Sequence, residues 1–170
     1  MIVIMHKTTL IVLLPLCLLG GAVKAAEQAK PSPAAKPLSA CSLVTKPEVE
    51  HAIGMTISAV EPMKSPRADA CAFTTQKGGA KVAIFAARSQ EKRDLSKALD
   101  KIRTAMPSAN VRELPGLGEK ALLVEHPTLG TMLSVYRAGD SLVVSVSDMR
   151  DVAKADAAAE MIARKAFSRF

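Results

Sequence analysis

The spacing of apolar residues changes along the chain, and these changes mark the limits of the elements that we expect. Between residues 56 and 147, several short runs alternate between apolar and polar side chains, which is typical of strands that bury one face. Glycine, proline and aspartate residues separate these runs and predict turns. The expected strands are residues 56–60, 70–75, 80–88, 111–114, 121–125, 132–137 and 141–147.

Two longer stretches carry apolar residues three or four positions apart, which predicts amphipathic helices. The first helix is expected to begin after Ser89 and to end before Pro107, with an apolar stripe formed by Leu95, Ala98, Leu99, Ile102 and Met106. The second is expected to begin at a cap formed by Asp148 or Asp151, with a stripe formed by Val152, Ala155, Ala159, Ile162, Ala166 and Phe167.

Each half of the chain therefore contains strands, a hairpin and a long helix. We interpret this order as a duplicated βββα unit, although residue identity between the halves is too low to show it. The expected strands have one apolar and one polar face each. We therefore predict an α+β fold in which an antiparallel sheet carries both long amphipathic helices on one face.

A short helix is expected ahead of the first strand. Thr45 and Glu48 have the spacing of a capping box, and Val44 and Val49 have the spacing of a hydrophobic staple. Gly54 supplies the left-handed residue that ends a short helix. The folded region is thus expected to begin near this helix and to form one α+β domain over residues 40–170, which is long enough for a single hydrophobic core.

Residues 1–25 have the pattern of a secretory signal peptide, with an apolar run over residues 10–23 and small residues near Ala25. Pro15 interrupts the run, which is shorter than the roughly 20 residues that cross a bilayer. We therefore expect cleavage, no transmembrane segment in the mature chain, and a periplasmic or secreted protein. Residues 26–39 are rich in alanine, proline and lysine, and we expect a disordered linker there.

Two cysteines remain after the expected cleavage, Cys41 and Cys71. An exported chain with two cysteines is typical of one structural disulfide in an oxidising compartment. The bridge would close a loop of about 30 residues and stabilise the fold by roughly 3–4 kcal/mol in the chain-entropy model. A redox role is less favoured, because the two cysteines are not in a Cys-x-x-Cys motif.

The chain is mildly basic, with a formal net charge of +7 that falls to +5 when the leader takes Lys7 and Lys24 with it. The basic residues are scattered, and the chain has no tryptophan and one tyrosine. Nucleic-acid binders cluster such charge and supply aromatic rings for base stacking. We therefore predict no nucleic-acid partner, and we interpret the charge as a solvated surface.

The candidate chemistry is sparse. His51 and His126 are the two histidines beyond the leader, and neither belongs to a set of three or four ligands with the spacing of a metal site. His126 precedes Pro127 and is expected to be exposed in a turn. Serine elbows and phosphate-binding loops are missing from the sequence. We expect no catalytic residue, no metal and no cofactor.

Methionine gives one further weak signal. Six methionines lie beyond the leader, and Met55 and Met63 flank the segment that holds the first expected strand. Thioethers and imidazoles bind soft metals together in exported copper carriers. His51, Met55 and Met63 are therefore kept as a possible ligand-binding set, against the alternative that the methionines simply pack in the core.

Three short motifs carry a resemblance. The start Cys41-Ser-Leu-Val-Thr followed by Glu48-Val49, the pair Cys71 and Phe73, and the turn from Pro115 to Ala121 resemble a loose group of exported bacterial domains of unknown function, many of them lipoproteins. This sequence departs from the group at Glu119 and in lacking a lipid-attachment cysteine. The resemblance implies a compact α+β sandwich, similar in outline to photosystem-accessory and extracellular sensor modules, and it transfers no catalytic residue.

These observations favour an exported, non-catalytic binding or interaction module with an unknown protein or small-molecule partner in the cell envelope. The segment over residues 61–69 and the turn at Gly116 are the expected recognition loops, because loops on a rigid scaffold commonly carry function. The alternative is a small-molecule or metal binder with a pocket between sheet and helices, lined by His51, Met55 and Met63. The sequence does not predict the oligomeric state.

Overall fold

The computed structural model describes residues 39–76, 79–88 and 95–170. The expected leader, the expected linker apart from Ser39, and the expected start of the first long helix after Ser89 lie outside these residues. None of the described helices is long and apolar enough to cross a membrane.

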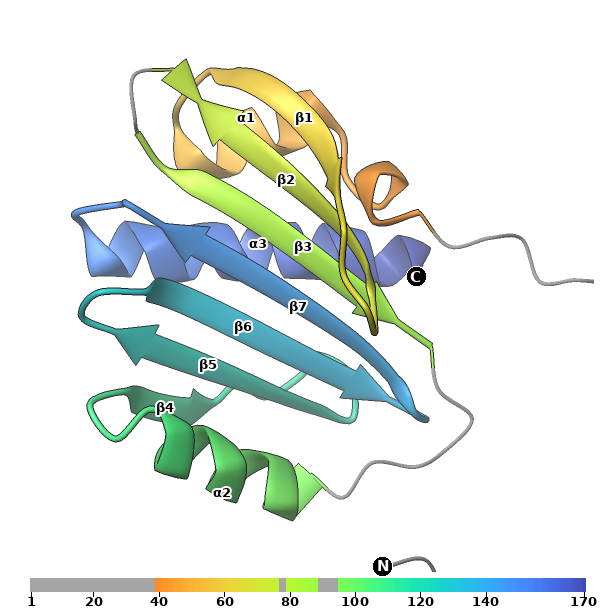
Figure 1. Cartoon of the computed structure of the whole chain (residues 1–170), viewed down its shortest axis with the longest axis vertical. Helices are drawn as coiled ribbons and strands as arrows, with labels where there is room; N and C mark the ends of the chain where they lie inside the picture. Colours follow the sequence, from red (N-terminus) through yellow and green to blue (C-terminus); the bar gives the residue numbers. More distant parts are fainter. Residues whose placement is uncertain (1–38, 77–78, 89–94) are drawn as a thin grey trace, which may run out of the picture. The chain divides into compact units, whose positions relative to one another are not determined.

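The described chain forms a seven-stranded sheet in which every neighbouring pair is antiparallel (Figure 1). The order of the strands is β1-β2-β3-β7-β6-β5-β4, so two runs of consecutive strands meet where β3 pairs with β7. The strands are β1 (Ile57–Met63), β2 (Asp69–Thr75), β3 (Lys81–Ala87), β4 (Asn110–Glu113), β5 (Lys120–His126), β6 (Gly130–Arg137) and β7 (Asp140–Ser147).

Each of the seven expected strands is present, and the main difference is the length of β1. This strand continues through Glu61 and Pro62 to Met63, so the connection to β2 is shorter than the sequence indicated. Pro62 is tolerated because β1 lies at the edge of the sheet, where a residue without an N–H leaves no inner ladder bond unmade.

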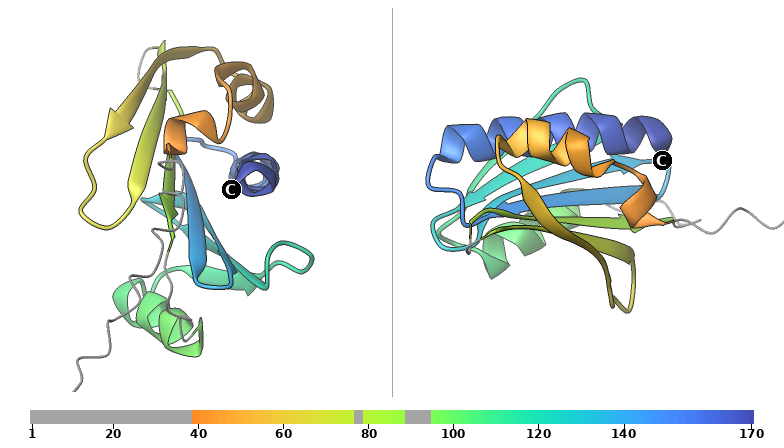
Figure 2. Two further views of the ribbon diagram at one scale, coloured as in Figure 1. Left: turned by 90° about the vertical axis from the view of Figure 1, so that its right-hand side faces the viewer. Right: turned by 90° about the horizontal axis from the view of Figure 1, so that it is seen from above.

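The helices are α1 (Lys46–Ile53), α2 (Leu95–Ala105) and α3 (Val152–Arg169), and a short 3-10 helix, η1 (Ala40–Ser42), precedes α1. Figure 2 shows α3 across one face of the sheet with α1 beside it, whereas α2 lies toward the opposite side, near β4. The expectation that both long helices share one face is therefore not confirmed. The partner of α3 on that face is α1, whose Val49 and Ile53 are buried there.

The run from Ala121 to Val124 gives the physical reason for this difference. All four residues of this run are buried, although alternate residues of a strand point to opposite faces. Leu123 belongs to the core under α3, and Leu122 and Val124 point to the other face. Strand β5 is therefore covered on both faces, as a continuous apolar run indicates.

The expected caps are present at two helices. The backbone N–H of Thr45 donates to Glu48 Oε2 at 2.9 Å, and Gly54 ends α1 with φ at +67°. Asp151, not Asp148, caps α3, because its Oδ1 accepts the backbone N–H of Lys154 at 3.1 Å. Three strands precede α2 and four lie between α2 and α3, so the βββα duplication stays a hypothesis.

Candidate functional site

Because neighbouring strands are antiparallel, turns and connections gather at the two ends of the strands, and the two ends hold different segments. We call one the stapled end; it holds the β1–β2 connection, the Gly116 turn and the end of α3. We call the other the pocket end; it holds the β5–β6 turn and the β7–α3 connection. We call the sheet face opposite α1 and α3 the second face.

The stapled end is tied together by covalent and charged contacts. The predicted disulfide is confirmed, since Cys41 in η1 is bonded to Cys71 in β2. The backbone N–H of Ala40 donates to Asp69 Oδ2 at 2.8 Å, which holds η1 against the start of β2. Both contacts anchor the start of β2, at the end of the expected recognition loop over residues 61–69.

A bidentate ion pair joins the last turn of α3 to the first turn of α1. Two guanidinium nitrogens of Arg169 donate to the two carboxylate oxygens of Glu48, each at 2.7 Å. The same guanidinium donates to the carbonyl of Leu43 at 3.0 Å. The hydrogen bond from Arg169, helped by the backbone N–H of Thr45, lowers the pKa of Glu48 from 4.5 to about 2.

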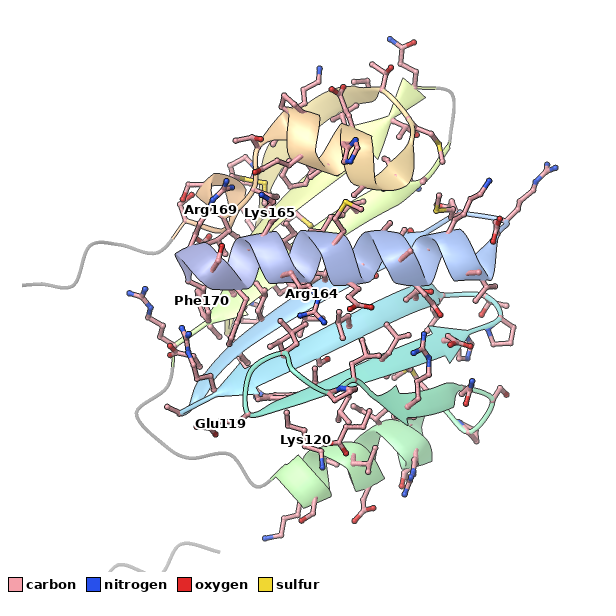
Figure 3. The ribbon with its side chains drawn as sticks, turned by 180° about the vertical axis from the view of Figure 1, so that it is seen from behind. Glu119, Lys120, Arg164, Lys165, Arg169 and Phe170 are labelled. Atoms are coloured by element: carbon pink, nitrogen blue, oxygen red, sulfur yellow. A yellow bond between two sulfur atoms is a disulfide. The ribbon has the colours of Figure 1, made fainter. Side chains whose placement is uncertain are left out.

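The Gly116 turn is also fixed by contacts within the domain, and it is not a loop that projects freely from it. Arg164 of α3 donates to the carbonyl of Gly116 at 3.2 Å, and Leu117 is buried in the core. Figure 3 shows Arg164 on the side of α3 nearest the sheet's β4 edge, and Lys165 and Arg169 on the side toward α1. The Gly116 turn joins the edge strand β4 to β5, whereas residues 64–68 follow the opposite edge strand β1. The two expected recognition loops therefore do not adjoin.

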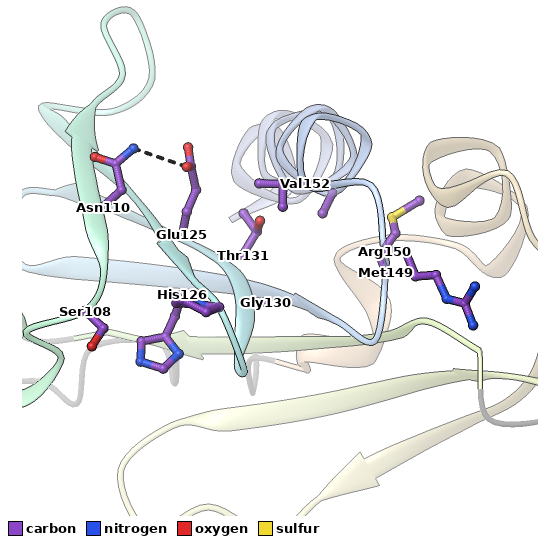
Figure 4. A pocket seen from close by; sticks show the side chains of 11 residues that line it. Ser108, Asn110, Glu125, His126, Gly130, Thr131, Met149, Arg150 and Val152 are labelled. Atoms are coloured by element: carbon purple, nitrogen blue, oxygen red, sulfur yellow. Dashed lines mark hydrogen bonds between the residues drawn. The ribbon is translucent and has the colours of Figure 1, made fainter.

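The pocket end contains a first hollow of about 370 Å³ beside the start of α3 (Figure 4). Glu125 lines it and accepts hydrogen bonds from Asn110 at 3.2 Å and from Arg112 at 3.2 Å. Arg112 also donates to Asp156 at 2.9 Å, and the hydroxyl of Thr131 donates to Asp156 at 2.8 Å. The bond to Asp156 raises the pKa of Arg112. This network is internally satisfied, and it fastens β4, β5 and β6 to α3.

His126 lies between two hollows and shapes the β5–β6 turn. Its Nδ1 accepts the backbone N–H groups of Thr128 at 3.2 Å and Leu129 at 3.3 Å. The ring is half-buried, and it is therefore more constrained than the exposed turn residue that the sequence indicated. Because Nδ1 accepts these bonds, the proton of the neutral ring is on Nε2, which leaves no free nitrogen lone pair for a metal.

A second hollow, of about 460 Å³, lies on the other side of that turn. Met106, which follows α2, lines it together with Val124, Met132 and Leu129. Leu129 is 57% exposed, so this hollow has a partly open apolar wall. Polar side chains at its margin come from the end of β7 and from the His126 turn.

A third hollow, of about 610 Å³, lies between α1, the start of β3 and the β7–α3 connection; we call it the His51 pocket. His51 and Met55 both line it, so the structure brings together two of the three residues that the sequence singled out. Met63 lies at the far end of β1, beside Ala70, and is 40% exposed. Met149, rather than Met63, lines the His51 pocket, and it also lines the first hollow. No sequence pattern indicated Met149 as a member of this set, because it comes from a distant segment.

The second face presents a row of apolar side chains across four strands. Direct strand pairing places Met63 beside Ala70, Ala70 beside Phe85, and Phe85 beside Val143. Phe85 and Val143 are half-buried, in contrast to the fully buried Phe73 and Val144 on the opposite face. At about 4.8 Å per strand, the row from Met63 to Val143 extends for about 14 Å. We call it the Phe85 row.

In comparison with known proteins, neither a protein-family model nor a curated protein matches this sequence. Within residues 39–76, 79–88 and 95–170, no group of three or more His, Cys, Asp or Glu side chains is placed to hold a metal ion.

Proposed function

We propose that the protein is an exported, non-catalytic interaction module whose partner protein contacts the Phe85 row. The observation that carries this proposal is the row itself, in which half-buried Phe85 and Val143 adjoin across β3 and β7, and exposed Met63 follows beyond the buried Ala70. A continuous apolar patch on a folded surface is typical of a protein interaction site, whereas scattered apolar residues are not.

The remaining support concerns the compartment. The disulfide between Cys41 and Cys71 is the kind of bond that persists in an oxidising environment. The pattern of residues 1–25 predicts export, and the resemblance to exported bacterial domains agrees with it. We therefore place the partner in the cell envelope. The proposal assigns no catalytic residue and no cofactor.

Photo-crosslinking in intact cells tests the interaction. A photoreactive amino acid replaces Phe85 in one sample and Met161 in the other, since Met161 is an exposed apolar residue on α3. We expect a discrete crosslinked product from position 85 that is weakened by Val143→Asp, because a charge within the row opposes apolar contact. Equal products from both positions, or no product from position 85, would contradict the proposal.

A second candidate function is small-molecule or metal binding in the His51 pocket. The specific observation is that α1 and the β7–α3 connection bring His51, Met55 and Met149 to one hollow of about 610 Å³. A ligand that binds the folded state raises the melting temperature by mass action. Native mass spectrometry of unreduced protein from the cell envelope should show a retained adduct. A bare chain that no ligand stabilises would argue against this function.

A further inference from the structure

The His51 pocket is distinguished by the type of donor atom that lines it. Met55 and Met149 contribute thioether sulfurs and His51 contributes an imidazole. Both methionines are half-buried and pack against the hydrophobic core, so their side chains start from defined positions. Figure 4 shows Met149 extending from the β7–α3 connection toward α1, away from His126.

The acidic side chains near this pocket already have partners. Asp148 lies 3.4 Å from the ammonium of Lys81, and Asp151 caps α3 and lies 3.7 Å from the ammonium of Lys154. Hard divalent ions prefer carboxylate and carbonyl oxygens, whereas thioethers select soft ions. The lining donors that have no salt-bridge or capping partner among the described residues are therefore the two thioethers and the imidazole.

The two histidines differ in a way that favours this pocket. The Nδ1 atom of His126 is occupied by backbone N–H groups of its own turn. In the described part of the chain, the ring of His51 makes no hydrogen bond, and it is exposed at the margin of α1. Either nitrogen of the neutral His51 ring is therefore available as a ligand.

Thiolates do not compete for a soft ion in this domain. Cys41 and Cys71 are joined in the disulfide at the stapled end, and the His51 pocket lies at the pocket end. The only other cysteine of the sequence is Cys17, which precedes the described residues.

We propose that Met55, Met149 and His51 together bind one soft monovalent cation, Cu(I), for which Ag(I) is a redox-inert substitute. This inference rests on the second candidate function and identifies the class of its ligand. Lys154 and Arg150 also line the pocket. Their charge opposes any cation there, so binding depends on the three donors, and one such set predicts one ion per chain.

Titration with Ag(I) provides the test, since it needs no reductant and leaves the disulfide intact. The full-length protein carries methyl-labelled methionine and Cys17→Ser, which removes the free thiol. We expect the methyl signals of Met55 and Met149 to shift with one equivalent of Ag(I). The signals of Met63 and Met161 should stay in place.

Affinity measurements then use leucine substitutions, which conserve most of the side-chain volume. Loss of an outer-shell partner commonly weakens metal binding about 10- to 100-fold, so removal of a direct ligand should cost at least as much. Met55→Leu, Met149→Leu and His51→Ala should each weaken Ag(I) binding by that amount. Met161→Leu is the matched control, because Met161 borders the neighbouring α1–α3 groove with His51 but does not line this pocket.

Three results would overturn the inference: no stoichiometric binding, full affinity in the double variant Met55→Leu/Met149→Leu, or shifts confined to Met106 and Met132. A small molecule bound in the pocket without any Ag(I) response would leave the second candidate function standing and refute the metal. The crosslinks from position 85 are independent of both results, because the Phe85 row lies on the second face.

Discussion

The stapled end and the pocket end both contain charged and polar side chains, but these side chains make different kinds of contact at the two ends. At the stapled end, a disulfide, a bidentate Arg169–Glu48 pair and the Arg164 contact to Gly116 join segments that are far apart in the sequence. At the pocket end, Arg112 and Thr131 also join distant segments through Asp156, but the turn and the connection that adjoin the three hollows are held by short-range hydrogen bonds. The comparison separates residues that fix the fold from residues that are free to bind.

The largest expected effect comes from removing the disulfide. The double variant Cys41→Ala/Cys71→Ala opens a cross-link with a sequence separation of 30. We expect its free energy of unfolding, measured by urea denaturation, to fall by about 3–4 kcal/mol. Met161→Leu, at an exposed position of α3, serves as the control, with no expected change in the midpoint. An unchanged midpoint for the double variant would mean that the stapled end does not depend on its covalent bond.

One glycine with a positive φ at each end allows the two ends to be compared by substitution. Gly130 at the pocket end and Gly116 at the stapled end have φ values of +83° and +72°. A Cβ at Gly130 would lie against the carbonyl oxygen of Val146 and 2.9 Å from Ser147 Cα, whereas a Cβ at Gly116 meets no described atom within 4 Å.

Gly116→Ala should therefore cost about 1–2 kcal/mol, which is the price of a left-handed backbone. Gly130→Ala should cost a further 1–3 kcal/mol, roughly, because backbone atoms must move as well. Urea denaturation of both variants measures the difference. Equal losses would show that the β6–β7 pairing next to Gly130 adjusts freely.

A smaller effect is expected at the His126 turn. His126→Ala removes the acceptor of the Thr128 and Leu129 N–H groups and should lower stability by about 1 kcal/mol. His126→Asn should recover most of this loss, because an asparagine oxygen accepts a backbone N–H two residues on. If the two variants were equally unstable, the ring would act through packing and not through Nδ1.

The smallest effect concerns acid stability at the stapled end. The pKa of Glu48 falls from 4.5 to about 2 in the folded state, so its contribution is complete above pH 4.5 and is lost as the pH falls toward 2. Arg169→Gln removes the main cause of this shift. We expect a shallower decline of the urea midpoint over that pH range, whereas Arg164→Gln, whose partner is Glu160, should keep the original slope.

Local features of the fold could be predicted because their causes are local. Alternation located the strands, and the spacing of Thr45 and Glu48 located the start of α1. The disulfide followed from the number of cysteines left after the leader. The side of α2 could not be predicted from its own stripe, because a stripe does not say which face of a sheet it meets. The continuous apolar run in β5 was the available signal that both faces are covered.

The candidate sites depended on long-range pairing, which single-sequence patterns do not encode. His51 and Met55 could be grouped because they lie four residues apart on either side of Gly54. Met149 joins them only because α1 lies beside α3 on the same face of the sheet. The Phe85 row likewise depends on the pairing of β3 with β7, two strands from different halves of the chain.

The most direct test of the proposed interaction uses two methionines as matched probes. Met63 at the end of the Phe85 row and Met161 on α3 have nearly equal exposure, 40% and 41%. Brief peroxide treatment of intact cells and of the purified protein, followed by mass spectrometry, gives the oxidation rate of each thioether. A partner on the Phe85 row should protect Met63 in cells relative to Met161, and Val143→Asp should remove the protection. Equal rates for both methionines in cells would contradict a partner on the second face.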